Sequence, residues 1–201
     1  MEGLIFFLSA WLCWVYLTFF AGKDMSYSKG MAAVVLISII VSPLHGEFEG
    51  MKIYGGSVCF FLYSLWFLWK AKLKKTVYIY LSAMVISAVY SSIRFFELFD
   101  PVIFVMNKLL FVSVITAFIA IILQNSVKWR LILISIGTFQ GELLISLVLR
   151  ENFFLDIGGY AYLDTLALSA GIIVFWSFLE HMRSWLNTSM TAFEKNKKSS
   201  P

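Results

Sequence analysis

The feature that most limits how this chain can fold is a series of seven long apolar stretches joined by short polar connections. A helix needs about 20 mostly apolar residues to cross a hydrocarbon layer about 30 Å thick. Backbone polar groups in lipid must pair within their own segment, so each stretch is predicted to be a helix. The predicted spans are residues 3–21, 26–42, 53–69, 76–93, 102–123, 131–149 and 160–179. The sequence therefore predicts an all-α, polytopic transmembrane helix bundle.

The composition argues against an ordinary soluble domain. Hydrophobic residues make up 60% of the chain and charged residues 14%, whereas soluble proteins carry roughly 45–50% and about 25%. This small number of charged residues cannot cover the surface of a small soluble protein. We therefore expect much of the protein surface to face lipid. The formal net charge of +4 does not indicate a nucleic-acid partner, because the basic residues form short clusters between apolar stretches.

The distribution of Lys and Arg predicts how the bundle is oriented. Basic residues are retained on the cytoplasmic side of a membrane. With the N-terminus outside and seven spans, most basic residues fall in the cytoplasmic connections and the C-terminal tail. The residues left outside are Lys52, Arg94, Lys108 and Arg150. We therefore expect a membrane protein with an external N-terminus and a cytoplasmic C-terminus.

The chain is predicted to consist of one domain and a tail. Residues 1–186 hold all seven spans and leave no connection long enough for a soluble domain. Residues 187–201 are polar and rich in Lys and Ser, a composition typical of disordered segments. They are predicted to form a disordered cytoplasmic tail.

An acidic residue in the middle of the sixth predicted span is the main candidate for a functional site. Glu142 shares one stripe of that helix, about 80° wide, with Ser135, Thr138 and Ser146. An ionised side chain within a bilayer normally faces the bundle interior and is paired. Arg94, near the outer end of the fourth span, is the first candidate partner. Two interpretations of the stripe are open. In the favoured one it holds helices together through hydrogen bonds, and in the other it relays protons or contacts a solute.

Small residues predict which helices pack together. Gly137 and Gly141 form a Gly-x-x-x-Gly motif, which lets a neighbouring backbone approach closely. The fourth span offers a face of small residues at four-residue spacing, namely Ala83, Ser87 and Ser91. We expect these two helices to be neighbours, an arrangement that would also bring Arg94 toward Glu142.

A lysine-rich connection follows the third span and predicts contact with the lipid surface. Its basic residues are Lys70, Lys72, Lys74 and Lys75. Anionic headgroups attract such clusters at about 1 kcal/mol per basic residue. The bilayer, including anionic lipid headgroups, is therefore an expected partner, together with a second copy of the chain or another membrane protein.

Motifs for catalysis, metals or cofactors are missing from the sequence. His45, Glu47 and Glu49 in one short connection are too few and too generic for a metal site, and no nucleotide-binding or hydrolase motif is present. We expect neither an enzyme nor a cofactor.

The opening residues 1–7 (MEGLIFF) and 11–16 (WLCWVY) resemble the start of the small YphA-type membrane proteins of Bacillus-like bacteria. Chain length and span layout are similar over most of the sequence. The resemblance implies a multi-pass bacterial membrane protein of a family without an established activity, so it carries over no catalytic residues. The expected function is a structural or partner-binding role in the membrane. The alternative is a small proton- or solute-coupled transporter that uses Glu142.

Overall fold

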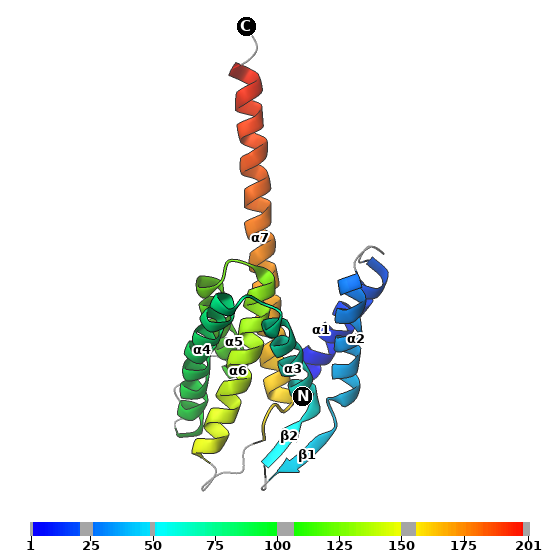
Figure 1. Ribbon diagram of the computed structural model, residues 1–201, viewed down its shortest axis with the longest axis vertical. Helices are drawn as coiled ribbons and strands as arrows, with labels where there is room; N and C mark the ends of the chain where they lie inside the picture. The colour runs from blue at the N-terminus through cyan, green and yellow to red at the C-terminus, as the bar shows by residue number, and fades with distance from the viewer. Residues whose placement is uncertain (1, 21–25, 49–50, 100–106, 150–155, 199–201) are drawn as a thin grey trace.

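The computed structural model describes residues 2–20, 26–48, 51–99, 107–149 and 156–198, which fold as a helical bundle with one small β-hairpin (Figure 1). Each predicted span corresponds to one helix of the bundle. The helices are α1 (Leu4–Val15, continued by the π-helical turn η1, Tyr16–Phe20), α2 (Ser26–Val41), α3 (Gly55–Trp69), α4 (Leu73–Phe99), α5 (Lys108–Leu123), α6 (Val127–Val148) and α7 (Tyr160–Lys198).

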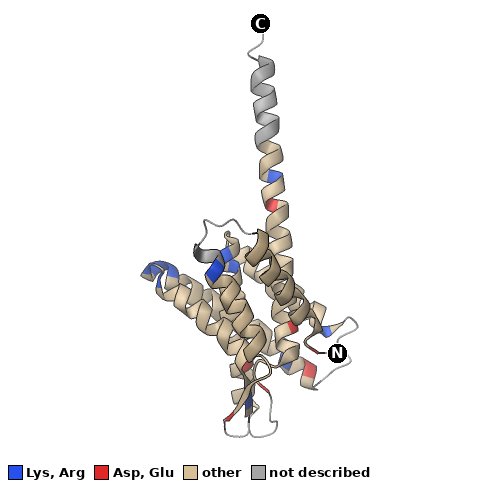
Figure 2. Ribbon diagram, turned by 90° about the vertical axis from the view of Figure 1, so that its right-hand side faces the viewer, with Lys and Arg blue, Asp and Glu red and all other residues tan. Residues whose placement is uncertain are grey.

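The helices run between two ends of the bundle that differ in charge. We call the end that carries the β-hairpin the hairpin end, and the end that carries Lys70, Lys75 and Lys128 the lysine end. Figure 1 shows the N-terminus near the hairpin end, while α7 emerges from the lysine end and continues to the C-terminus. Figure 2 shows Lys and Arg gathered at the lysine end, whereas Asp and Glu lie mostly toward the hairpin end.

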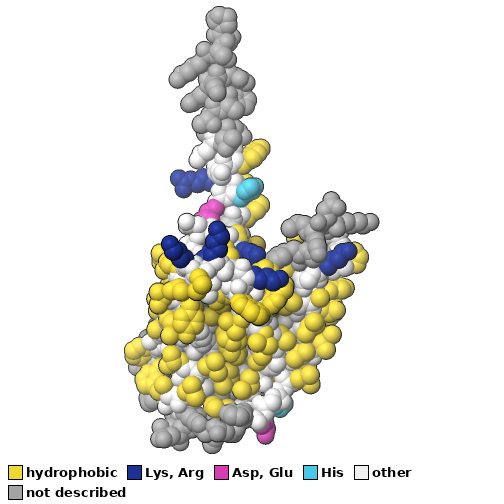
Figure 3. Space-filling model, viewed as in Figure 1, with side chains coloured by type: hydrophobic (Ala, Val, Ile, Leu, Met, Phe, Trp, Pro, Cys, Tyr) yellow, Lys and Arg dark blue, Asp and Glu magenta, His cyan; other side chains and the backbone are white. Residues whose placement is uncertain are grey.

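The sides of the bundle carry the hydrophobic surface expected of a protein in lipid. Figure 3 shows a continuous band of hydrophobic side chains with basic residues along one rim. The segments Leu73–Leu98, Val127–Val148 and Tyr160–Asn187 are long and apolar enough to cross a membrane. The remaining apolar helices are shorter, at 10–17 residues: Leu4–Phe20, Lys29–Val41, Gly55–Trp69 and Lys108–Leu123.

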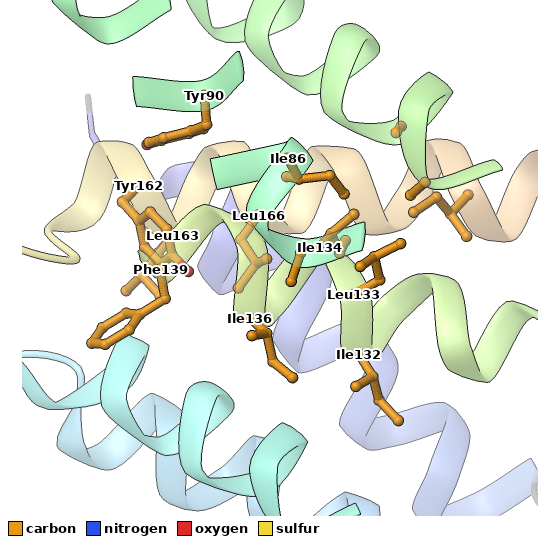
Figure 4. Close-up of a cluster of buried hydrophobic side chains, with 14 of the residues drawn as sticks. Ile86, Tyr90, Ile132, Leu133, Ile134, Ile136, Phe139, Tyr162, Leu163 and Leu166 are labelled. Carbon is orange, nitrogen blue, oxygen red and sulfur yellow. The ribbon is translucent and has the colours of Figure 1, made fainter. Parts of the chain in front are cut away.

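Helix α6 lies at the centre, in contact with α3, α4, α5 and α7. Because neighbours surround it, residues on every side of this helix are buried. Figure 4 shows its side chains packed against those of α4 and α7; the labelled residues are Ile86, Tyr90, Ile132, Leu133, Ile134, Ile136, Phe139, Tyr162, Leu163 and Leu166. Helices α1 and α2 pack on the outside of this core, against α7 and α3 respectively.

Two glycines of α6 lie directly against α4. A methyl group added at Gly137 would lie 2.7 Å from Cβ of Ile86, and one added at Gly141 would lie 2.7 Å from Cδ1 of Tyr90. The carbonyl oxygens of Ala83 and Ser87 would lie 3.1 Å from these two methyl groups. The α4–α6 contact is therefore a close backbone approach that only glycine permits.

The third residue of the predicted α4 face contributes less to this contact. Ala83 and Ser87 are fully buried, but Ser91 is only half-buried, and its hydroxyl donates to the carbonyl oxygen of Ala88 in its own helix. Ile86 and Tyr90, rather than Ser91, fill the space beside the glycines.

The hairpin was not predicted from the sequence, which placed only a short connection there and began the third span at residue 53. Strand β1 (His45–Phe48) pairs antiparallel with β2 (Met51–Tyr54), with His45 opposite Tyr54. Ile157 extends this pairing, because its N–H donates to the carbonyl oxygen of Lys52 and its carbonyl accepts from the N–H of Tyr54. The turn before α7 is thereby tied to the turn before α3.

Residues 187–198 differ from the predicted disordered tail, because α7 continues as a helix to Lys198. At 1.5 Å per residue, its 39 residues span about 58 Å, nearly twice the thickness of a hydrocarbon core. Nucleation is the costly step of helix formation, and no Gly or Pro interrupts the chain between Asn187 and Lys198. A helix that is already anchored in the bundle therefore propagates through this polar segment.

We predict that Gly137→Ala and Gly141→Ala each lower the free energy of unfolding by about 1–3 kcal/mol, because the added methyl group overpacks the α4–α6 contact. Gly171→Ala in α7 is the matched control: among the described residues, no heavy atom outside the adjoining backbone of α7 lies within 4 Å of the added methyl group, so its effect should be small. Reversible unfolding in mixed detergent micelles measures all three. Equal effects at the three positions would contradict the close approach of α4 and α6.

Candidate functional site

The candidate site is built around Glu142 of α6, whose side chain is only 3% exposed. The hydroxyl of Tyr90 donates to Oε1 of this carboxylate at 2.5 Å. The backbone N–H of Gly158 reaches Oε2 at 3.5 Å, and Nε of Arg94 lies 3.6 Å from Oε1. Helix α4 and the turn before α7 therefore both converge on the carboxylate, which lies among donors and a positive charge.

Helix α4 presents the two side chains that contact Glu142 on one face. Tyr90 and Arg94 are four residues apart, a spacing that stacks side chains one helical turn from each other. The absence of a side chain at Gly141 gives the Tyr90 ring its position beside α6. The close α4–α6 contact therefore sets the distance between the phenol and the carboxylate.

The Gly158 contact depends on a backbone conformation that suits glycine. Gly158 has a φ of +70°, in the left-handed region that other residues rarely adopt. A methyl group here would also overlap the side chain of Ser57 at the start of α3. Glycine thus lets the turn approach α3 on one side and present its N–H to Glu142 on the other.

A chain of alternating charges leads from Glu142 toward the surface of the hairpin end. Arg94 Nη1 lies 2.8 Å from Oε2 of Glu97, and Lys108 Nζ lies 2.8 Å from Oε1 of the same carboxylate. The exposed side-chain fraction is 16% at Glu97, 26% at Arg94 and 61% at Lys108. Lys108 therefore pairs with Glu97 at the surface end of this series of charged side chains.

These side chains line a cavity of about 240 Å³ at the hairpin end. Its polar lining consists of Glu2, Arg94, Glu97, Lys108, Glu142 and Ser146. The cavity gives the otherwise buried carboxylate of Glu142 access to a small polar space. Chemically, the arrangement is suited to holding a charge or a small polar molecule.

The other residues of the predicted polar stripe lie in two places, at this cavity and in the packed interior of the bundle. The hydroxyl of Thr138 donates to the carbonyl oxygen of Ile134 and lies 3.1 Å from the Tyr162 hydroxyl. The hydroxyls of Ser135 and Ser146 are buried without a hydrogen-bond partner among the described residues. Of these three, only Ser146 shares the cavity with Glu142.

A second buried carboxylate, which the sequence analysis did not single out, joins α7 to α1. Asp164 of α7 accepts from the N–H groups of Gly3 and Phe6, both at 2.7 Å. Both N–H groups lie at the start of α1 and have no acceptor within the helix itself. The negative charge of Asp164 also lies at the positive end of the helix dipole. The signal in the sequence was a lone acid in the first turns of an apolar helix.

A third buried charge ties α6 to α7 at the lysine end. Arg130 is buried, and its Nη1 and Nη2 lie 2.8 and 3.2 Å from the two carboxylate oxygens of Glu180. Its Nε donates to the carbonyl oxygen of Gln124 at 2.6 Å. The sequence analysis did not single out either residue of this pair.

The lysines predicted to meet lipid headgroups lie beside aromatic rings at this end. Lys70 Nζ is 3.5 Å from the centre of the Trp66 ring, and Lys75 Nζ is 4.0 Å from that of Trp129. Lys128, from the connection before α6, lies over Phe67 at 4.1 Å. Lys72 and Lys74 are exposed. The structure thus joins two connections into one basic and aromatic surface.

Metal ligands do not gather in the described part of the chain: no three His, Cys, Asp or Glu side chains are grouped there in a way that could hold an ion. His45 and Glu47 lie on β1, whereas Glu49 is outside the described residues. Cys13 and Cys59 are both free thiols.

Comparison with known proteins gives a family match over nearly the whole chain. The model of the YphA-like integral membrane protein family matches residues 2–199. The chain is also 24% identical, over 187 residues, to a protein named "Uncharacterized protein YphA" from Bacillus subtilis (strain 168), and the match covers 92% of each chain. No solved structure matches the chain.

Proposed function

Because the chain belongs to the YphA-like integral membrane protein family, we propose that it is a seven-span protein of the bacterial plasma membrane with a structural, partner-binding role. The family match also agrees with the resemblance of the opening residues described above. In this proposal the hairpin end faces outward and the lysine end faces the cytoplasm.

The charge distribution supports this orientation. Lys70, Lys75 and Lys128 lie at one end, beside aromatic rings. The rings beside Lys70 and Lys75 belong to tryptophan, which suits the headgroup region. Glu47 and Asp156 lie near the other end, on and beside the hairpin. The four shorter helices fit a bilayer that thins locally or a bundle whose flanking side chains reach the interface, each at modest energetic cost.

The structural role is supported by the closely packed core between Glu142 and the lysine end. The contact between Thr138 and Tyr162 lies one turn from Glu142. Beyond it, Leu133, Ile134 and Leu163 are fully buried. Tight packing of this kind supports a rigid bundle and does not provide a path for a solute from the cavity to the lysine end.

The partner-binding aspect is supported by α7. The helix extends beyond the lysine end (Figure 1), and its exposed side chains Met182, Trp185 and Leu186 lie on one side, away from the Arg130–Glu180 contact. A rigid helical arm that carries apolar side chains is suited to contact with another membrane protein or a second copy of the chain. Anionic lipid headgroups are the proposed partners of the lysine-rich surface.

A transporter role is the second candidate, and the cavity favours it. The cavity at the hairpin end reaches Glu142, and carboxylates in such positions serve as proton-relay or substrate sites in transporters. A transport cycle would require the packing around Thr138 and Tyr162 to open.

The topology is tested by labelling single cysteines in a Cys13→Ser, Cys59→Ser background. We expect Glu47→Cys to react with a membrane-impermeant maleimide on intact cells, because β1 faces outward in this account. Lys72→Cys should react only after the cells are permeabilised. Labelling of both positions, or of Lys72→Cys alone, on intact cells would contradict the proposed orientation.

The choice between scaffold and transporter is tested in proteoliposomes loaded with a pH-sensitive dye. We expect an imposed proton gradient to decay at the same rate with wild type, with Glu142→Gln and without protein, because the packed core blocks a path. Faster decay with wild type that disappears with Glu142→Gln, while the variant remains folded, would support the transporter and overturn the structural role.

A further inference from the structure

The cavity at the hairpin end contains a buried polar group to which the described residues offer no hydrogen-bond partner. The side chain of Ser146 is 1% exposed, and its hydroxyl has no hydrogen-bond partner among the described residues. The same residue lines the cavity. A buried hydroxyl without a partner is unfavourable, so a molecule within the cavity is the natural source of the missing hydrogen bond.

The cavity is large enough for more than water. Its volume of about 240 Å³ far exceeds the roughly 10–15 Å³ that one water molecule requires. Leu98, Ile145 and Ala161 form the apolar part of the lining, which we call the apolar wall. The lining therefore suits a small molecule that has a polar group and a short apolar part.

Charges of both signs face this one small space. Glu142 and Arg94 approach within 3.6 Å, and Glu97 joins Arg94 to Lys108 through contacts of 2.8 Å. A purely anionic ligand would lie beside carboxylates, and a purely cationic one would lie beside a guanidinium and an ammonium group. Charge complementarity favours a ligand that carries both charges.

We propose that the cavity at the hairpin end is a binding site for a small zwitterion of the α-amino-acid class. The ligand carboxylate faces Arg94 and Lys108, its ammonium group faces Glu142, and the Ser146 hydroxyl completes the polar contacts. The short side chain of the ligand packs on the apolar wall. Ligand recognition at this site goes beyond the structural role proposed above and does not depend on it.

The probe is L-alanine, with propionate and ethylammonium as analogues that each lack one of its two charged groups. Isothermal titration of the purified full-length chain in detergent should give saturable binding of L-alanine at millimolar concentration or below. Each analogue should bind at least about tenfold more weakly, because it can form only one of the two charge contacts that L-alanine would form in the cavity. No detectable binding of L-alanine, or equal binding of an analogue, would overturn the proposal.

Two serines of α6 provide a matched pair of variants. Ser146→Ala should weaken L-alanine binding about three- to tenfold, the loss expected for one hydrogen bond. Ser135→Ala, which also removes a buried, unpartnered hydroxyl but lies outside the cavity, should leave the affinity unchanged. Both variants remove a polar group without a partner, so both should fold. Equal effects of the two substitutions on binding would contradict the assignment of the site.

Discussion

The burial of one carboxylate in a lipid-surrounded bundle is the constraint on which the rest of the structure depends. Glu142 is almost completely buried, and an unpaired charge in such a place is strongly unfavourable. Tyr90, Arg94 and the N–H of Gly158 surround it. These groups come from two separate parts of the chain, so stabilising one charge fixes α4, α6 and the turn before α7 relative to one another.

Buried charges perform the same task elsewhere in the molecule. Asp164 connects α7 to the start of α1, and Arg130 connects α6 to Glu180 of α7. In lipid, apolar helix faces do not strongly distinguish one neighbour from another, so close packing and polar contacts select the pairs. Each of these three contacts joins a different set of segments, and together they fix α1, α4, α6 and α7 relative to one another.

The sequence was sufficient to predict elements that depend on local composition. Long apolar stretches indicate helices because lipid forces internal backbone pairing, and Gly137 with Gly141 indicated a close helix contact. Arg94 was expected near Glu142, and its Nε lies 3.6 Å away. The Tyr90 hydroxyl, which is the closer donor, was not expected, because an aromatic residue in an apolar stretch shows no sign of a specific partner.

Features that depend on distant parts of the chain could not be predicted in this way. The hairpin is completed by Ile157, more than 100 residues from its partner strand, and Asp164 meets Gly3 only after α1 and α7 have packed. The helical continuation of α7 was missed because composition alone favours disorder, whereas a helix already anchored in the bundle extends without a new nucleation step. Local patterns therefore predict the elements, and long-range polar contacts determine how they meet.

The Tyr90 phenol directly stabilises the Glu142 carboxylate and thereby holds α4 against α6. A double-mutant cycle of Tyr90→Phe and Glu142→Gln, measured by reversible unfolding in mixed micelles, tests this contact most directly. We predict a coupling free energy of about 1 kcal/mol or more, as expected for a hydrogen bond to a charged group. Effects that are additive to within about 0.5 kcal/mol would show that the two side chains do not interact and would contradict it.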